Sequence, residues 1–521
     1  MKFAQLLCLC AAACHSPADR PLIQQPAAAA TPTQVPGLGR ISFPNSGPAE
    51  AQAAFLRGVL LLHSFEYEDA AEEFRAAQAA APDFALAYWG EALTYSHPIW
   101  HEENVEKARA VLTRLAPDAA GRAAKAGDER ERALLASLEV LFGGGTRGER
   151  ARAYAEALGA LQARYPDDLE LAAFHALAVL GTSTQGRDLP TYMRAAALAE
   201  EILTRAPDHP GALHYAIHCY DDPVHAPLGL RMARRYGQVA AAAEHALHMP
   251  AHIYVALGMW PASIEANLAA SAAADARRAR KGLDADARGY HSLYWLEYSY
   301  LQLGEGAEAA RLLARMRADE KEKSSPRTRQ HLVAMRAAYV IALETYDHEV
   351  ARFEVALDGL DPAPASAELY LRGRVALARG DVAKAQEALA ALAVQRGPLE
   401  TLLSEGASAA ACCAPTTRSS YLPGRLAAHV MELELAGLIT LHTGPEDEAL
   451  AQLAAAAEKE DAMGFDFGPP VVVEPAHELL GRILLERGQR AEAAAEFEAA
   501  LRRAPGRQRS LQGLASARAD G

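Results

Sequence analysis

Apolar and small residues recur along this chain at intervals of three and four, the spacing that places side chains on one face of an α-helix. In "RGVLLLHSFEYEDAAEEFRAAQAAAPDFALAYWGEAL", five punctuating residues follow one another at spacings of 12, 4, 3 and 5: Gly58, Ala70, Phe74, Ala77 and Pro82. The segment "LGRILLERGQRAEAAAEFEAALRRAP" repeats these spacings from Gly481 to Pro505. Each segment predicts two amphipathic helices, the second ended by its proline.

This pattern resembles the tetratricopeptide repeat, in which small residues let two antiparallel helices touch. Weaker copies begin near Gly373 and Gly437, and others end at Pro166 and Pro207, so the resemblance covers most of residues 50–515. A single helix pair cannot bury its own apolar face, whereas stacked pairs bury it for one another. The resemblance therefore implies an all-α fold, a tetratricopeptide-like α-solenoid superhelix of antiparallel helix pairs with a concave groove.

Composition supports a helical, globular protein. Hydrophobic residues make up 50% of the 521 positions and charged residues 23%, while aromatic residues are only 7%. Alanine is abundant, and it favours helices over strands. The net charge is −14 and no basic stripe is present, so we expect no nucleic-acid partner.

The first fourteen residues, "MKFAQLLCLCAAAC", have the layout of a signal or lipoprotein leader: Lys2, a short apolar run, then small residues before Cys14. "AAAC" is similar to a bacterial lipobox, although Ala11 stands where that motif usually has leucine. We expect export to the cell envelope or periplasm, with membrane attachment through a lipidated Cys14. Plain secretion after cleavage is the alternative.

Three further segments follow this leader. Residues 15–48 are rich in proline and alanine and predict a disordered tether. An N-terminal repeat array at 49–320 and a C-terminal array at 331–515 are expected on either side of the charged stretch "ADEKEKSSPRTRQ" at 318–330. The segment at 405–424 predicts a long loop.

Histidines are concentrated in two short stretches, "HPGALHYAIHCYDDPVHAPLG" from His209 and "HALHMPAHIYVALGMW" from His245. His248 follows His214, and His252 follows His218, at the period of one tetratricopeptide repeat, which is about 34 residues. In the tetratricopeptide-repeat family, the corresponding positions line the groove. Because helical residues four apart share a face and neighbouring helices lie about 8–10 Å apart, these rings are expected to meet.

The chemistry expected of such a cluster is metal binding, because neutral imidazole binds zinc, copper and iron. We predict a metal site made of His214, His218, His248 and His252 and completed by His291 or Asp221. Asp221 and Asp222 are candidate catalytic residues, as acceptors for an imidazole N–H or as a general base. His225 and His245 are expected only outside the ligand set. Metal-assisted hydrolysis and oxidation are both compatible with this pattern.

Other residues are candidates for the groove wall. His63 and His97 are also separated by one repeat period, and "AYWGEAL" contributes Trp89 and Glu91. His175 is a possible contribution from the other side. For His63 and His97, a polar cap at a helix end is the alternative, and for Trp89 it is a place in the repeat core.

The competing function is a non-enzymatic scaffold that binds a peptide or protein partner in the groove. Whole segments such as "YWGEALTYSHPIW" resemble uncharacterised secreted bacterial tetratricopeptide-repeat (lipo)proteins. That resemblance supports the fold and an exported location, and it implies no substrate.

Overall fold

The computed structural model describes residues 32–184, 187–399, 421–465 and 468–519, and these residues are almost entirely helical. Two short antiparallel hairpins are the only strands within those ranges. One pairs β1 (Thr33–Val35) with β2 (Gly39–Ile41), and the other pairs β3 (Ser96–His97) with β4 (Glu102–Glu103). The leader, with Cys14, and most of the loop expected at 405–424 lie outside the described residues.

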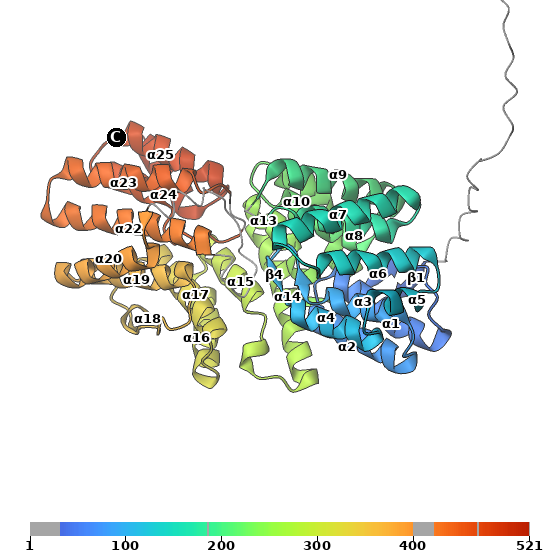
Figure 1. The fold of residues 1–521 in the computed structure, drawn as a ribbon. Helices are drawn as coiled ribbons and strands as arrows, with labels where there is room; N and C mark the ends of the chain where they lie inside the picture. The colour runs from blue at the N-terminus through green and yellow to red at the C-terminus, as the bar shows by residue number, and fades with distance from the viewer. Residues whose placement is uncertain (1–31, 185–186, 400–420, 466–467, 520–521) are drawn as a thin grey trace, which may run out of the picture.

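The helices form two lobes with α14 and α15 between them (Figure 1). The N-terminal lobe contains α1 (Ala49–His63), α2 (Tyr67–Ala80), α3 (Ala85–Leu93), α4 (Val105–Leu115), α5 (Ala119–Ala124), α6 (Glu129–Leu141), α7 (Arg147–Arg164), α8 (Leu169–Gly181), α9 (Leu189–Arg205), α10 (Pro210–Tyr220), α11 (Ala226–Val239), α12 (Glu244–His248) and α13 (Pro250–Ala256). Next come α14 (Trp260–Lys281) and α15 (Tyr290–Gln302), separated by the short 3-10 helix at Ala285–Ala287. The C-terminal lobe contains α16 (Gly306–Glu322), α17 (Pro326–Leu343), α18 (Glu349–Arg352), α19 (Pro362–Ala378), α20 (Val382–Arg396), α22 (Tyr421–Thr443), α23 (Glu446–Asp461), α24 (Ala476–Glu486), α25 (Arg490–Arg503) and α26 (Gln508–Arg518).

The first strong copy of the repeat forms the expected helix pair. Phe74 of α2 is fully buried between two glycines, Gly58 of α1 and Gly90 of α3. A Cβ atom added to Gly58 would lie 2.9 Å from the Phe74 ring, and one added to Gly90 would lie 2.3 Å from it. The small residues are therefore needed because an aromatic ring occupies the space between three consecutive helices.

The last repeat is built in the same way. Phe497 of α25 lies between Gly481 of α24 and Gly513 of α26, where added Cβ atoms would approach the ring to 3.1 and 2.2 Å. In both triplets the phenylalanine lies midway in sequence between its two glycines, and the separation is the same in the first triplet as in the last. The predicted all-α array of antiparallel helix pairs is confirmed at both ends of the chain.

The hydrophobic core divides earlier than the boundary expected at 320–331. One buried cluster extends from Leu38 to Ala256 and a second from Tyr290 to Ala517. The charged stretch at 318–330 instead belongs mostly to α16 and α17, which pack against each other. Its charges occupy mostly exposed or half-buried helix positions, so a charged run here does not mark a linker.

Residues 32–48 also differ from the disordered tether that was expected. The β1–β2 hairpin and the residues just after it carry three buried apolar side chains that belong to the first core: Leu38, Ile41 and Phe43. The backbone N–H of Ala242 donates to the carbonyl oxygen of Gly37 at 2.8 Å, which fastens the hairpin to the loop between α11 and α12. The apolar residues interspersed among the prolines provide the burial that order requires.

None of the described helices is both long enough and apolar enough to cross a membrane.

Candidate metal centre

Two prolines position the histidine-bearing helices. Pro210 begins α10, whose N-cap is His209, and α10 presents His214 and His218 one turn apart. Pro250 separates the short α12 from α13, so that His248 ends one helix and His252 lies in the next. Proline is favoured at these first positions because its missing N–H would have no helical partner there.

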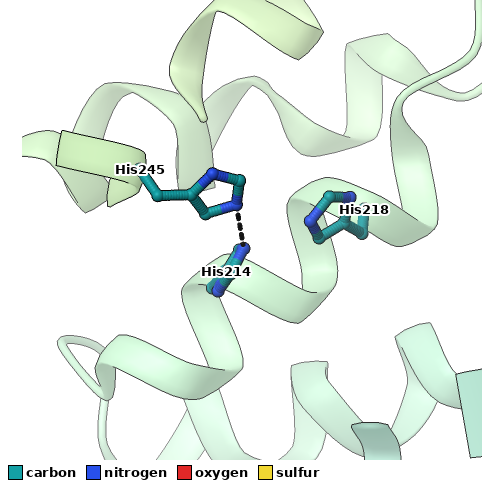
Figure 2. Close-up of side chains that lie close together, drawn as sticks. All are labelled: His214, His218 and His245. Atoms are coloured by element: carbon teal, nitrogen blue, oxygen red, sulfur yellow. Dashed lines mark hydrogen bonds between the residues drawn. The ribbon is translucent and has the colours of Figure 1, made fainter. Parts of the chain in front are cut away.

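The first His trio consists of His214, His218 and His245 (Figure 2). One ligand nitrogen from each residue lies within 4.8 Å of the others. Nε2–H of His245 donates a hydrogen bond to Nε2 of His214 at 3.2 Å. Two nitrogens that bind one tetrahedral zinc ion at about 2.0–2.1 Å lie about 3.3 Å apart, so this pair already has the required separation.

Hydrogen bonds and burial fix the protonation of these rings. Nδ1–H of His214 donates to the carbonyl oxygen of His63 at 2.6 Å, which leaves the lone pair on Nε2. Burial, and then the nearby imidazoles, hold the pKa values of His214 and His245 well below their usual range. Nε2 of His218 is buried and has no hydrogen-bond partner among the described residues. His214 and His245 are therefore held in the neutral form that metal binding requires.

The second His trio consists of His248, His252 and His291. Its ring centroids are 5.0 Å apart between His248 and His252 and 4.6 Å apart between His248 and His291. Nδ1–H of His248 donates to Oδ1 of Asn267 at 2.7 Å, and the Asn267 amide donates in turn to the carbonyl oxygen of Ser263 at 2.9 Å. The amide orientation thus assigns the His248 lone pair to Nε2.

Asp221 lies between the two trios. Its Oδ2 accepts a hydrogen bond from Nδ1 of His252 at 3.1 Å and lies 3.5 Å from Nδ1 of His218, while Arg187 donates to Oδ1 at 2.5 Å. Burial would raise the pKa of Asp221, but Arg187 and the two imidazoles hold it well below the usual range. An ionised carboxylate in this position orients imidazole ligands.

Asp222, the other catalytic candidate, belongs to neither trio. Its Oδ1 accepts hydrogen bonds from the backbone N–H groups of Val224 and His225 at 2.9 and 3.0 Å, and its carboxylate also accepts from the His225 ring and from Arg187. These contacts stabilise the turn before α11. The expectation of a catalytic role for Asp222 is therefore not supported by its position.

His63 belongs to a separate buried group with Glu170 and His209. Its Nε2–H donates to Glu170 at 2.8 Å, and the hydroxyl of Tyr215 donates to its Nδ1 at 2.8 Å. His209 donates to the other oxygen of Glu170 at 3.2 Å. Burial would raise the pKa of Glu170, but the imidazoles of His209 and His63 lower it to about 2. Every ring nitrogen of His63 and His209 has a protein partner, so the group is structural.

His97 and His175 are also separate from the trios. α3 ends at Leu93, so His97 lies on β3 and not at the helical position that its spacing from His63 implied. Its ring stacks on Tyr67 with centroids 3.9 Å apart. His175 on α8 is hydrogen-bonded to Gln162 at 2.5 Å. Neither residue contributes to the expected groove site.

Trp89 and Glu91 lie inside the repeat core and not on a groove wall. Trp89 is fully buried against Phe43 and Phe174, with ring centroids 5.7 and 5.1 Å apart. The Glu91 carboxylate accepts a hydrogen bond from Gln78 at 2.6 Å and pairs with arginine side chains. Tryptophan packs the repeat here, which was the alternative interpretation.

The four histidines expected to form one site are shared among overlapping groups: two trios, each with a further histidine, and a group of His218, His252 and Asp221 that joins them. His291 was expected to join them, and His245 was placed outside the ligand set. The sequence did contain a signal for His245: it lies three positions before His248, at the start of the same short helix. The four predicted side chains are at most 2% exposed, so the site is buried and not on an open groove.

A cavity lies close to the first trio. Its walls are mainly apolar, and Leu62, Tyr67 and Phe174 are among the residues that line it. Tyr67 stacks on Phe65, whose ring lies 4.2 Å from that of His214 between centroids. One aromatic residue thus separates this cavity from the first trio.

No protein-family model matches this chain, and no curated protein sequence matches it. Among solved structures, the chain is similar to the Cut9–Hcn1 hetero-tetramer of APC/C at 13% identity, with 92% of this chain and 78% of that one covered and a TM-score of 0.38. It is also similar to yeast Tom70, at 13% identity, 90% and 94% coverage and a TM-score of 0.31. The tetratricopeptide-repeat domain of P58(IPK) matches at 14% identity, 90% and 97% coverage and a TM-score of 0.22. The helix pairs of this chain themselves define an all-α solenoid of the tetratricopeptide-repeat type.

Proposed function

We propose that this chain is an exported helical-repeat protein that binds a transition-metal ion (zinc, copper or iron) at the first His trio. The observation that carries the proposal is the arrangement of its nitrogens. Nε2 of His214 and Nε2 of His245 are 3.2 Å apart, and the buried Nε2 of His218 beside them has no hydrogen-bond partner among the described residues. An unpartnered buried nitrogen is costly, and a bound cation would compensate for that cost.

A ligand set of three imidazoles also fits a catalytic metal better than a structural one. Catalytic zinc commonly has three protein ligands and keeps its fourth position for water or substrate. Such an ion would supply a Lewis acid and an activated water for hydrolysis, and copper or iron would supply redox chemistry for oxidation. The chain itself contributes neutral imidazoles and the carboxylate of Asp221, which orients His218.

Metal analysis of the purified full chain tests this proposal. After incubation with zinc and removal of free metal, elemental analysis should find zinc bound to the wild-type protein. His214→Ala should reduce the bound zinc by one equivalent, and His245→Ala, at a partly exposed position, should do the same. His175→Ala is the matched control, because this histidine lies outside both trios. The proposal is wrong if wild-type protein binds no zinc, copper or iron, or if both trio variants keep the full amount.

Export and lipid attachment are also part of the proposal, on the basis of the leader at 1–14 and its Cys14. Expression with this leader in a bacterium that processes lipoproteins should yield a membrane-associated protein with added lipid mass. Cys14→Ser should release it. Secretion of wild-type protein without added lipid would support export but refute the lipid anchor.

The cavity close to the first trio favours a second candidate function, the binding of a partner. Its apolar walls suit the apolar side chain of a peptide or protein ligand. This function needs no metal. A peptide from a library that still binds after metal is removed would support this function. The same peptide should no longer bind when Ala178, which lines the cavity, is replaced by tryptophan.

A further inference from the structure

We infer that the second His trio binds a second metal ion beside the first, and that Asp221 is a positioning residue shared by both sites. This inference rests on the proposed function, because it extends the same centre from one ion to two. The ligands of the second ion would be His248, His252 and His291, which offer three imidazole nitrogens within 4.8 Å of one another.

The two trios are built alike and lie side by side. Each contains two histidines separated by four positions and one histidine from elsewhere in the sequence. Across the boundary between them, the ring centroids of His218 and His252 are 5.4 Å apart, and those of His245 and His248 are 6.2 Å apart. The repeat thus duplicates one half-site in the adjacent helix pair. A centre with two metal ions requires such a second pair of histidines, together with a third imidazole of its own.

The position of Asp221 links the two trios. One oxygen, Oδ2, faces Nδ1 of His218 in the first trio and Nδ1 of His252 in the second. Because Nδ1 of each ring faces the carboxylate, Nε2 of each ring points away from it. Arg187 neutralises this buried carboxylate, so Asp221 can remain ionised without being a metal ligand.

The surroundings also hold the second trio in place. Trp295 of α15 packs against all three of its rings, with centroids 4.9, 4.6 and 5.3 Å from His248, His252 and His291. Gly468 also lies against Trp295, where an added Cβ would come within 2.2 Å of the indole. The tryptophan therefore has no room to move, and rigid walls of this kind favour a preorganised ligand set.

Zinc stoichiometry measured on the full chain separates two ions from one. Wild-type protein should bind two equivalents, and His252→Ala and His214→Ala should each bind one. His291→Ala, at a partly exposed position, gives the same test with less risk to folding, which far-ultraviolet circular dichroism would monitor. One equivalent in wild type that persists in both His252→Ala and His291→Ala would overturn the inference and leave the proposed function intact. Binding of no zinc, copper or iron by wild-type protein would overturn both.

Copper provides a readout of proximity. With two equivalents of Cu(II), electron paramagnetic resonance should show dipolar coupling between the ions, because they occupy adjacent trios. His291→Ala with one equivalent should give the signal of an isolated ion. Two uncoupled signals in wild-type protein would contradict the paired centre.

The role of Asp221 is tested against its neighbour. Asp221→Asn should weaken zinc binding at both sites by about 10- to 100-fold, as is usual when a carboxylate behind a metal-binding histidine is removed. Asp222→Asn is the matched control, because Asp222 also pairs with Arg187 but belongs to neither trio. Equal affinities in the two variants, or an effect of Asp221→Asn on one site only, would refute the shared role.

Discussion

Zinc binding to the first His trio should depend only weakly on pH on the acidic side of neutrality. Metal binds the neutral form of histidine, so an ordinary imidazole competes with protons. With a pKa of about 6.5, such a ring is about 90% neutral at about pH 7.5 but only about 25% neutral at about pH 6.0. Each ordinary ligand would therefore weaken zinc binding about fourfold over this interval.

The structure changes this expectation for two of the three ligands. Burial and neighbouring imidazoles hold the pKa values of His214 and His245 well below the usual range, so both rings stay neutral at about pH 6.0. If both rings had ordinary pKa values, zinc affinity would fall about 14-fold between about pH 7.5 and about pH 6.0, or about 1.6 kcal/mol. We expect the protein not to show this loss. We therefore expect the dissociation constant for zinc to rise less than about fivefold over this interval.

Isothermal titration of the full chain with zinc, in two buffers of different ionisation enthalpy, measures both quantities. It gives the dissociation constant at each pH and the number of protons released for each ion. At about pH 6.0 we expect about one proton or fewer for each ion bound at the first trio. His252→Ala, which disables the second trio, isolates that site. Release of about two or more protons, or a loss of affinity above about tenfold, would refute the argument from burial.

Three further outcomes follow from the packing and from the other buried groups. Gly90→Ala should destabilise the protein by about 1–3 kcal/mol in urea denaturation, because its Cβ would lie 2.3 Å from Phe74, whereas Gly144→Ala, with no neighbouring atom within 4 Å, should change little. Burial, Arg327 and His291 lower the pKa of His331 to about 3, well below the value of about 6.5 in the unfolded chain. The unfolded chain therefore binds a proton at His331 before the folded protein does, and stability falls as the pH drops below about 6.5. Between about pH 7.5 and about pH 5.0, wild type should lose at most about 2 kcal/mol of stability relative to His331→Leu. Glu170→Gln should lower stability by about 3 kcal/mol yet leave the zinc stoichiometry unchanged, and a loss of zinc would show that its histidine group is not merely structural.

The parts of the site that the sequence predicted are those fixed by the repeat period. A separation of one full repeat correctly placed His214 beside the segment of His248, and His218 beside that of His252, because equivalent helices of adjacent repeats pack together. The same spacing failed for His97. There the helix ends at Leu93 and the chain turns into β3, so the register of the repeat is no longer maintained. Periodicity predicts contacts only while both helices continue.

The division into two trios could not be predicted, because it depends on where short helices end. His245 reaches His214 because the short α12 begins beside the turn between α1 and α2, where Glu66 accepts a hydrogen bond from the His245 backbone N–H at 3.0 Å. No apolar period encodes that contact. Its consequence is nevertheless chemical: it gives the first trio its third nitrogen and leaves His248 to pair with His291. One irregular turn thus converts a histidine pair that the repeat duplicates into two sites of three ligands each. The zinc stoichiometry of His245→Ala tests this directly, because the variant should lose one ion and retain the other.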